Sequence, residues 1–151
     1  MIQIRAIGKL KNNTPETELI HDYLKKTREK IKVLEYVEKR TLPVCELKEA
    51  EAQLLLSDMP ENAFIIALDE HGKTLSSREF ADKLKKVKDA AQSIVFMIGG
   101  ANGHGQKVLE KAHLQLSFGR MTLPHFLIRV VLAEQLYRAT TIWNNHPYHR
   151  D

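Results

Sequence analysis

The sequence predicts a single α/β domain built on a mostly parallel sheet. Short apolar runs alternate with longer amphipathic segments, which is typical of strands and helices that follow one another in an open sheet. Two of the runs, residues 63–68 and 93–98, are apolar almost throughout, as in strands covered on both faces. No repeat or linker interrupts the 151 residues. Residues 1–151 are therefore expected to form one domain.

The first half of the chain contains two expected strands and two expected helices. Residues 2–7 are rich in isoleucine and predict the first strand. Thr14-Pro15 follows as a helix cap with proline at the first helical position. The β-branched run 31–37 predicts a second strand, and a more polar helix is expected over 47–56. Ser57-Asp58-Met59-Pro60 should end that helix.

The second half begins with the apolar run 63–68, the third expected strand. Residues 69–73 are interpreted as a turn, and Ser76 with Glu79 forms the capping box of an amphipathic helix. Residues 93–98 predict the fourth strand. The remaining expected elements are a short helix over 106–112, a short strand over 114–118 and a last helix from Pro124 to Trp143.

Composition and charge limit the class of protein. The formal charge is +4 and the sequence pI is near 9.2, which favours a polyanionic partner weakly. The lysine-rich runs 25–28 and 83–88 fit solvated helix faces better than a binding patch. Charged residues interrupt the apolar stretch Phe126–Trp143, so we expect no membrane span. Because the start lacks a signal-peptide pattern and Cys45 is the single cysteine, we expect a cytoplasmic protein.

A glycine-rich loop, Ile98–Gly105, joins an expected buried strand to a short helix. Glycines let backbone amides approach a ligand closely, and the carboxyl edge of an open sheet is the usual place for a nucleotide-like ligand. The same residues fit equally well a tight strand-to-helix turn that needs glycine only for its geometry and binds no ligand. The loop lacks the features of a phosphate-binding loop and of the dinucleotide fingerprint. The loop after the first strand, Gly8–Lys11, also lacks the common methyltransferase glycine motif.

The last expected helix is apolar on nearly every side, so it should be buried on more than one face. In a domain this small, we expect one face to pack on the sheet and another to meet a second copy, which predicts a two-fold homodimer. Cover by other helices of the same chain is the alternative. Glu134 and Arg138 have the spacing of an ion pair on the narrow polar strip.

The sequence does not favour metal or hydrolase chemistry. His146 and His149 lie close together, but no cysteine or carboxylate completes a ligand set, so no metal is expected. Cys45 lacks a nucleophile signature, and no Gly-x-Ser-x-Gly elbow is present. The C-terminal residues 144–151 combine an aromatic ring, two histidines and Arg150 around a rigid proline. Such a tail is suited to fold over a ligand and to contact phosphate and base.

Four segments together resemble one family. They are Ile-Gly-Gly-Ala-Asn-Gly at 98–103, Leu-Ser-Phe-Gly-Arg-Met-Thr-Leu-Pro-His at 116–125, Glu-Gln-Leu-Tyr-Arg-Ala at 134–139 and Asn-His-Pro-Tyr-His-Arg at 145–150. The Thr-Leu-Pro-His segment and the C-terminal tail, separated by the same spacing as in that family, are the most specific part of the resemblance. With them the chain resembles the RlmH family of the SPOUT methyltransferases along its whole length, most densely from Phe64 onward.

The resemblance implies a SPOUT-type α/β fold. This is an open sheet of about five or six strands with helices on both faces and a C-terminal deep trefoil knot, an exception to the rule that chains avoid threading. It also implies a cofactor, S-adenosyl-L-methionine, held in the knot by backbone groups without a ribose-binding acid. Carried over to this sequence, the cofactor-binding residues are Leu68, Gly100, Phe118, Gly119, Arg120, Met121, Thr122 and Leu123.

The activity that the resemblance implies is methylation of a ring nitrogen (N3) of a pseudouridine in large-subunit (23S) ribosomal RNA. The expected substrate is the assembled ribosome, and the expected form is a homodimer. Tyr148 is expected to close over the cofactor, and His149 to act as base or to orient the substrate. Arg138 and Arg150 would hold phosphate or the base edge. For Arg138, an ion pair with Glu134 fits equally well.

Two other functions fit the same sequence. The fold could act on another RNA such as tRNA, or the chain could be a non-catalytic ribosome-binding or assembly protein that keeps the pocket as a relic. Mild basicity without an RNA-binding appendage favours a substrate, such as a ribosome, that supplies most of the docking surface. The complete glycine loop and tail favour an enzyme.

Overall fold

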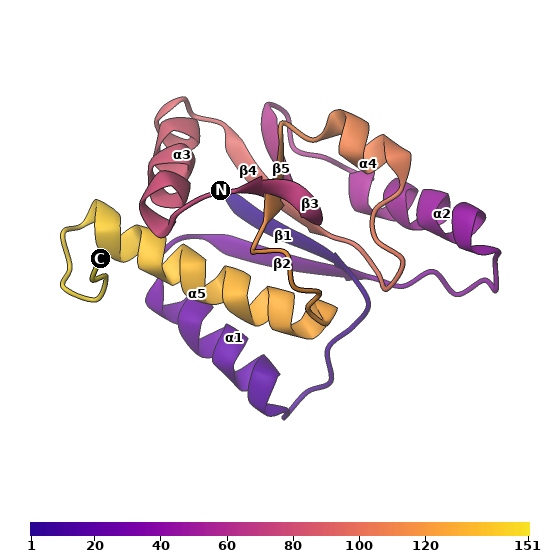
Figure 1. The fold of residues 1–151 in the computed structure, drawn as a ribbon, viewed down its shortest axis with the longest axis horizontal. Coiled ribbons are helices and arrows are strands. Elements are labelled where there is room, and N and C mark those ends of the chain that lie inside the picture. Colours follow the sequence, from indigo (N-terminus) through magenta and orange to yellow (C-terminus); the bar gives the residue numbers. More distant parts are fainter.

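The computed structural model describes residues 1–151 and alternates strand and helix from end to end (Figure 1). The elements are β1 (Ile2–Ile7), α1 (Pro15–Lys26), β2 (Ile31–Tyr36), α2 (Val44–Leu56), β3 (Ala63–Thr74), α3 (Ser77–Asp89), β4 (Ser93–Ile98), α4 (Gln106–Lys111), β5 (Leu114–Ser117) and α5 (His125–Trp143). The expected α/β class is confirmed. Every expected element is present, and α2 begins at Val44, three residues earlier than expected.

The five strands form one parallel sheet in the order β2-β1-β4-β3-β5. Chain order and sheet order therefore differ, and β3, β4 and β5 become neighbours on one side of the sheet. In a parallel sheet the carboxyl ends of all strands meet at one edge. The segments that follow Leu68, Ile98 and Ser117 consequently leave the sheet close together.

Helices cover both faces of the sheet, as the resemblance implies (Figure 1). Side chains of successive strand residues point to opposite faces, so the sheet divides the core in two. Ile66 and Phe96 belong to the core under α3 and α5, whereas Ile65 and Val95 belong to the core under α2 and α4. The trefoil knot stays a prediction.

The expectation of a turn at residues 69–73 is wrong, because β3 continues to Thr74. The strand pairs with β5 before and after an irregularity, with Leu68 and Lys73 both opposite Leu116. Gly72 makes this second pairing possible. A Cβ atom there would lie 2.6 Å from the backbone of Gln115, so only glycine allows the two chains to approach.

Helix α5 lies between α1 and α3 on one face of the sheet (Figure 1). Leu132 and Leu136 are completely buried in the core, while Leu127 is 40% exposed. Cover by helices of the same chain, the alternative reading of this apolar segment, thus accounts for much of its composition. The homodimer stays a prediction. No helix is long and apolar enough to cross a membrane.

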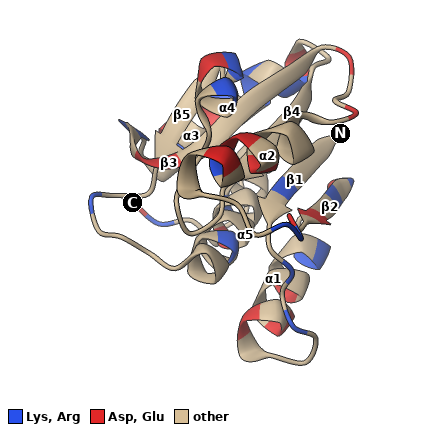
Figure 2. Cartoon of the chain, turned by 90° about the vertical axis from the view of Figure 1, so that its right-hand side faces the viewer, with Lys and Arg blue, Asp and Glu red and all other residues tan.

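The lysine-rich runs lie on solvated helix faces, as the sequence indicates. On α3, Leu84 and Val87 are buried, whereas Lys85 and Lys88 are exposed and pair with carboxylates. On α1 the acidic residues Glu16 and Glu18 lie in the first turn and Lys25 and Lys26 in the last, and Figure 2 shows acidic and basic segments on both α1 and α2.

Candidate active site

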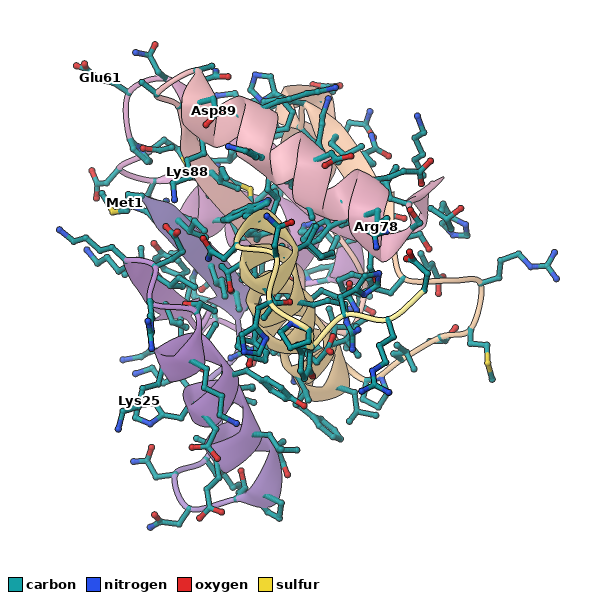
Figure 3. All side chains as sticks on the ribbon, turned by 90° about the vertical axis from the view of Figure 1, so that its left-hand side faces the viewer. Met1, Lys25, Glu61, Arg78, Lys88 and Asp89 are labelled. Carbon is teal, nitrogen blue, oxygen red and sulfur yellow. The ribbon has the colours of Figure 1, made fainter.

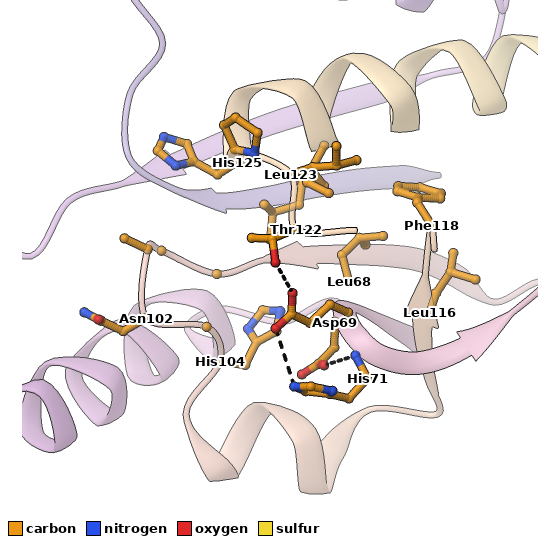
Figure 4. A pocket seen from close by; sticks show the side chains of 18 of the residues that line it. Leu68, Asp69, His71, Asn102, His104, Leu116, Phe118, Thr122, Leu123 and His125 are labelled. Atoms are coloured by element: carbon orange, nitrogen blue, oxygen red, sulfur yellow. Dashed lines mark hydrogen bonds and ion pairs between the residues drawn. The ribbon is translucent and has the colours of Figure 1, made fainter. Parts of the chain in front are cut away.

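A cavity of about 780 Å³ lies at the carboxyl edge of β3, β4 and β5 (Figure 4). Its walls come from the end of β3, the glycine loop after β4, the segment after β5 and the first turn of α5. This volume is typical of sites for small molecules and cofactors. The expected cofactor-binding residues that line the cavity are Leu68, Gly100, Phe118, Gly119, Met121, Thr122 and Leu123. Arg120 is exposed and does not line it.

The glycine loop combines the two roles that its sequence allows. It is a tight turn, because Gly103 has a φ angle of +81° and its amide donates to the carbonyl of Gly100. It also lines the cavity with backbone. A Cβ atom on Gly100 would lie 3.0 Å from the carboxylate of Glu51 on α2 and 3.3 Å from Ile7, so a side chain there is tightly placed and requires a small shift of these neighbours or of the loop. Burial, with the charge of Glu38, raises the pKa of Glu51.

The segment after β5 forms the opposite wall. The Ser117 hydroxyl accepts from the amide of Gly119 at 3.1 Å, which tightens the start of the segment. Gly119 has a φ angle of +129°, a backbone conformation that favours glycine. The Thr122 hydroxyl donates to Glu70 at 3.1 Å and thereby joins this wall to β3. The side chain of Met121 is 83% exposed at the rim.

His104 is the most buried polar side chain of the cavity wall, at 5% exposure. Its Nε2 atom lies 3.1 Å from the carbonyl oxygen of Met97, so Nε2 carries the proton and donates. Nδ1 is then an acceptor, and it is buried without a partner. Desolvation by burial lowers the pKa of His104, which keeps the ring neutral. The wall therefore contains one unused hydrogen-bond acceptor.

Two carboxylates at the cavity were missed by sequence reasoning. Asp69 and Glu70 directly follow the buried part of β3 and line the cavity, together with Lys48 of α2. The dinucleotide fingerprint places its ribose-binding acid after the glycine loop, whereas both of these acids precede that loop in the chain. The rule that ligands bind beyond the carboxyl ends of parallel strands would have singled out two acids after a buried strand.

The three expected catalytic residues lie together, but at the other end of α5. Arg138 forms an ion pair with Glu134, with nitrogen–oxygen distances of 2.5 and 3.0 Å. The Tyr148 hydroxyl donates to the same Glu134 carboxylate at 3.0 Å, and burial together with this bond raises the pKa of Tyr148. Arg138 also donates to Nδ1 of His149 at 3.1 Å. The ion pair that was the alternative for Arg138 is therefore present.

The C-terminal residue fastens the tail to α3. The Arg78 guanidinium donates three hydrogen bonds of 2.7 to 2.9 Å to the carboxylate of Asp151, and Nε2 of His149 donates to the same carboxylate at 2.9 Å. Figure 3 shows the C-terminal tail ending beside Arg78 of α3. These hydrogen bonds, those from Arg78 first, lower the pKa of Asp151 to about 2. Both ring nitrogens of His149 are thus engaged within the chain. Arg150 is exposed.

The cavity and the tail cluster are separated along α5. His125, the first residue of α5, lines the cavity, and Arg138 lies thirteen residues further on. At the rise of an α-helix this is about 20 Å. Within one copy of the chain, the cavity and the cluster of the three expected catalytic residues therefore do not meet.

Histidines are frequent, but they do not gather around a common point. No three His, Cys, Asp or Glu side chains stand close enough to hold a metal ion. His146 accepts from the amide of Tyr148, whereas His149 binds Arg138 and Asp151.

Comparisons with known proteins place this geometry in a family. The family model described as predicted SPOUT methyltransferase matches residues 1–149. The chain is 48% identical to ribosomal RNA large subunit methyltransferase H of Paramagnetospirillum magneticum over 97% of both chains. It is 44% identical to the protein of the same name from Rhodospirillum rubrum, again over 97% of both.

A solved structure shares the fold at much lower identity. A probable methylase family protein from Haemophilus influenzae Rd KW20 superposes with a TM-score of 0.56 at 12% identity, covering 99% of this chain and 70% of that one. The full-length match to the family model and the high identity to full-length relatives agree with a cavity built from the loops that the resemblance names. The chain belongs to the SPOUT methyltransferases, in the family of the ribosomal RNA large subunit methyltransferases H.

Proposed function

We propose that this chain transfers a methyl group from S-adenosyl-L-methionine to N3 of a pseudouridine in large-subunit ribosomal RNA of the assembled ribosome. The observation that carries the proposal is the cavity at the carboxyl edge of β3, β4 and β5, lined by Leu68, Gly100 and the segment from Phe118 to Leu123. The names of the close relatives support the substrate class.

The walls of the cavity fit the proposed cofactor. Backbone of the glycine loop and of the segment after β5 can hold an adenosine without side-chain ligands, and Phe118 and Ile98 give apolar contact. The unpartnered Nδ1 of His104 is an acceptor for a ligand group, once a small shift exposes it. When bound, the cofactor supplies an activated methyl on a sulfonium, whose leaving group is a neutral thioether. No acid is needed on that side.

The protein's main contribution is alignment. Holding donor and acceptor in line can be worth an effective molarity of about 10⁵ M or more. The acceptor nitrogen also has to lose its proton, and a positioned base adds about 10²-fold. The raised pKa of Tyr148 keeps its phenol protonated, so Tyr148 acts as a donor. His149 is the candidate for base or for substrate orientation, and its Nδ1 must first leave Arg138.

The separation of cavity and tail supports the proposed homodimer. About 20 Å of helix divides His125 from Arg138 in one copy, so the tail of a second copy is the simplest source of the catalytic cluster. Sedimentation of the purified chain at micromolar concentration tests this. A dimer is expected, and a monomer would contradict it.

The decisive experiment for the function is methyl transfer with the proposed substrate. Purified protein and radiolabelled S-adenosyl-L-methionine are incubated with whole ribosomes from a strain lacking this enzyme, and the label is mapped. We expect label at a single pseudouridine of the large subunit. Label on tRNA instead would establish the other RNA substrate. Cofactor binding without transfer to either RNA would favour the non-catalytic assembly protein.

A further inference from the structure

The irregular end of β3 gives the cavity an acidic side. After Leu68 the strand leaves its register with β5, and Asp69 and Glu70 line the cavity before pairing resumes at Lys73 (Figure 4). Both carboxylates are held in place. Asp69 accepts from the amide of His71 at 2.8 Å, and Glu70 accepts from Thr122 at 3.1 Å.

The charged side chains around the cavity do not balance. Lys48 is the one lysine or arginine that lines it, against the two carboxylates of Asp69 and Glu70. With histidines counted as neutral, the lining carries one net negative charge. This departs from the chain as a whole, whose formal charge is +4. The cavity is therefore acidic in a basic protein.

A second observation points in the same direction. His104 is 95% buried in the wall, and its Nδ1 atom is an acceptor without a donor. Burial keeps the ring from gaining a proton, so Nδ1 stays an acceptor. This wall thus presents two carboxylates to the cavity and holds a buried ring nitrogen behind its surface, and all of these groups accept hydrogen bonds or attract positive charge. Its complement is a ligand rich in N–H donors with a net positive charge.

From this arrangement we propose that Asp69 and Glu70 are specificity-determining residues that make the cavity prefer the charged methyl donor to its neutral-sulfur product. The inference rests on the proposed function. S-adenosyl-L-methionine carries a sulfonium, an ammonium and a carboxylate, a net charge of +1. Transfer breaks the bond from methyl to sulfur and forms the bond from methyl to nitrogen. The sulfur keeps the electron pair, the ring nitrogen loses its proton, and S-adenosyl-homocysteine has no net charge.

The carboxylates therefore bind the donor more strongly than the product. The carboxylates stabilise the positive charge of the sulfonium, and the reaction removes this charge. They therefore favour the replacement of bound S-adenosyl-homocysteine by S-adenosyl-L-methionine after each transfer. Because Glu70 is about half exposed, solvent and salt screen part of its contribution. The expected preference is about tenfold in affinity.

The experiment uses titration calorimetry on the full chain carrying both Asp69→Asn and Glu70→Gln. These changes remove the charges and keep oxygens that accept from the His71 amide and from Thr122. The probes are S-adenosyl-L-methionine, S-adenosyl-homocysteine and sinefungin, which carries a positive amine at the place of the sulfonium. The matched control removes two charges elsewhere through Glu18→Gln and Glu61→Gln, both exposed and outside the cavity.

We expect the double variant to bind both charged probes about tenfold more weakly and the neutral-sulfur product nearly as well as the unchanged protein. The control should bind all three probes normally. Equal weakening of donor and product would show that the carboxylates only shape the cavity and would overturn the inference, as would no weakening at all. If the unchanged chain bound none of the probes, the proposed function itself would fail, and that outcome is visible before any variant is compared.

Discussion

The two ends of α5 carry the two halves of the candidate site, and they differ in how their polar groups are satisfied. Near the first turn of α5, the cavity wall holds Nδ1 of His104 without a partner, and Asp69 and Glu70 line the cavity with one hydrogen bond each from the chain. At the far end of α5, Glu134, Arg138, Tyr148 and His149 bind one another. The cavity therefore has polar groups available for a ligand. The side chains of the tail cluster already bind one another, and they must exchange partners before they can bind a substrate.

The largest expected effect is at the cavity end, with Gly100→Val. The Cβ atom alone is already tightly placed against Glu51 and Ile7, and the two methyl groups of valine extend beyond it, so these neighbours or the glycine loop must shift. Overpacking of this kind costs about 1–3 kcal/mol, so cofactor affinity measured by calorimetry should fall by up to about 100-fold. Ala90→Val is the control, because Ala90 is exposed and lies outside the cavity, so a similar enlargement of a small residue should leave cofactor affinity unchanged. Normal affinity in the Gly100 variant would mean that the loop is only a turn.

The next prediction concerns the tail at the far end of α5, where a variant should lower turnover without changing cofactor affinity. His149→Ala should lower turnover of ribosomal RNA about 100-fold and leave cofactor affinity unchanged. Single-turnover rates and calorimetry separate the two quantities. His146→Ala serves as control, since His146 is exposed and contacts only the amide of Tyr148. If the His149 variant lost cofactor affinity as well, the two ends of α5 would not be separate halves. Unchanged turnover would remove His149 from the candidates.

The smallest effect concerns pH and the unpartnered nitrogen. Because burial lowers the pKa of His104, the unfolded chain takes up a proton below about pH 6.5 that the folded chain refuses. The free energy of unfolding should therefore fall as the pH drops below that value, by at most about 1.4 kcal/mol per pH unit from this group, until the folded pKa is reached. Urea unfolding at a series of pH values measures the slope. His104→Leu should lose this part of the slope, and an identical slope in both proteins would contradict a neutral buried ring.

Much of the fold could be predicted because the signals are local. Thr14, Ser76 and Glu79 cap their helices as expected, and the apolar runs of β3 and β4 lie buried in the sheet. The prediction that was wrong concerns a segment whose structure depends on a strand far away in the sequence. The segment 69–73 looked like a turn because its letters are polar, yet β5 pairs with it. Sequence spacing carries no information about such pairing.

The candidate site also combines features that the sequence predicted with features that depend on residues far apart in the chain. The residues of the cavity were expected from the resemblance, and their closeness follows from the strand order β4-β3-β5, which no local pattern encodes. Arg129 is one of the charged residues that interrupt the apolar stretch Phe126–Trp143, and the sequence assigned it no partner. In the structure it is 4% exposed, pairs with Glu35 at 2.6 Å and donates to the carbonyls of Ile7 and Gly8. Its partners lie more than ninety residues away in the chain.

The position of α5 also determines when the molecule can fold. The helix follows all five strands along the chain, yet it fills the space between α1 and α3, and Leu132 and Leu136 complete the core that begins with Ile2 and Ile4. A nascent chain without α5 leaves that face of the sheet open to water, and contacts this distant in sequence form slowly. We expect the cavity to form only when α5 has left the ribosome that makes it and has docked on the sheet. A protein proposed to act on ribosomes thus gains its binding site only after its other nine helices and strands have been synthesised.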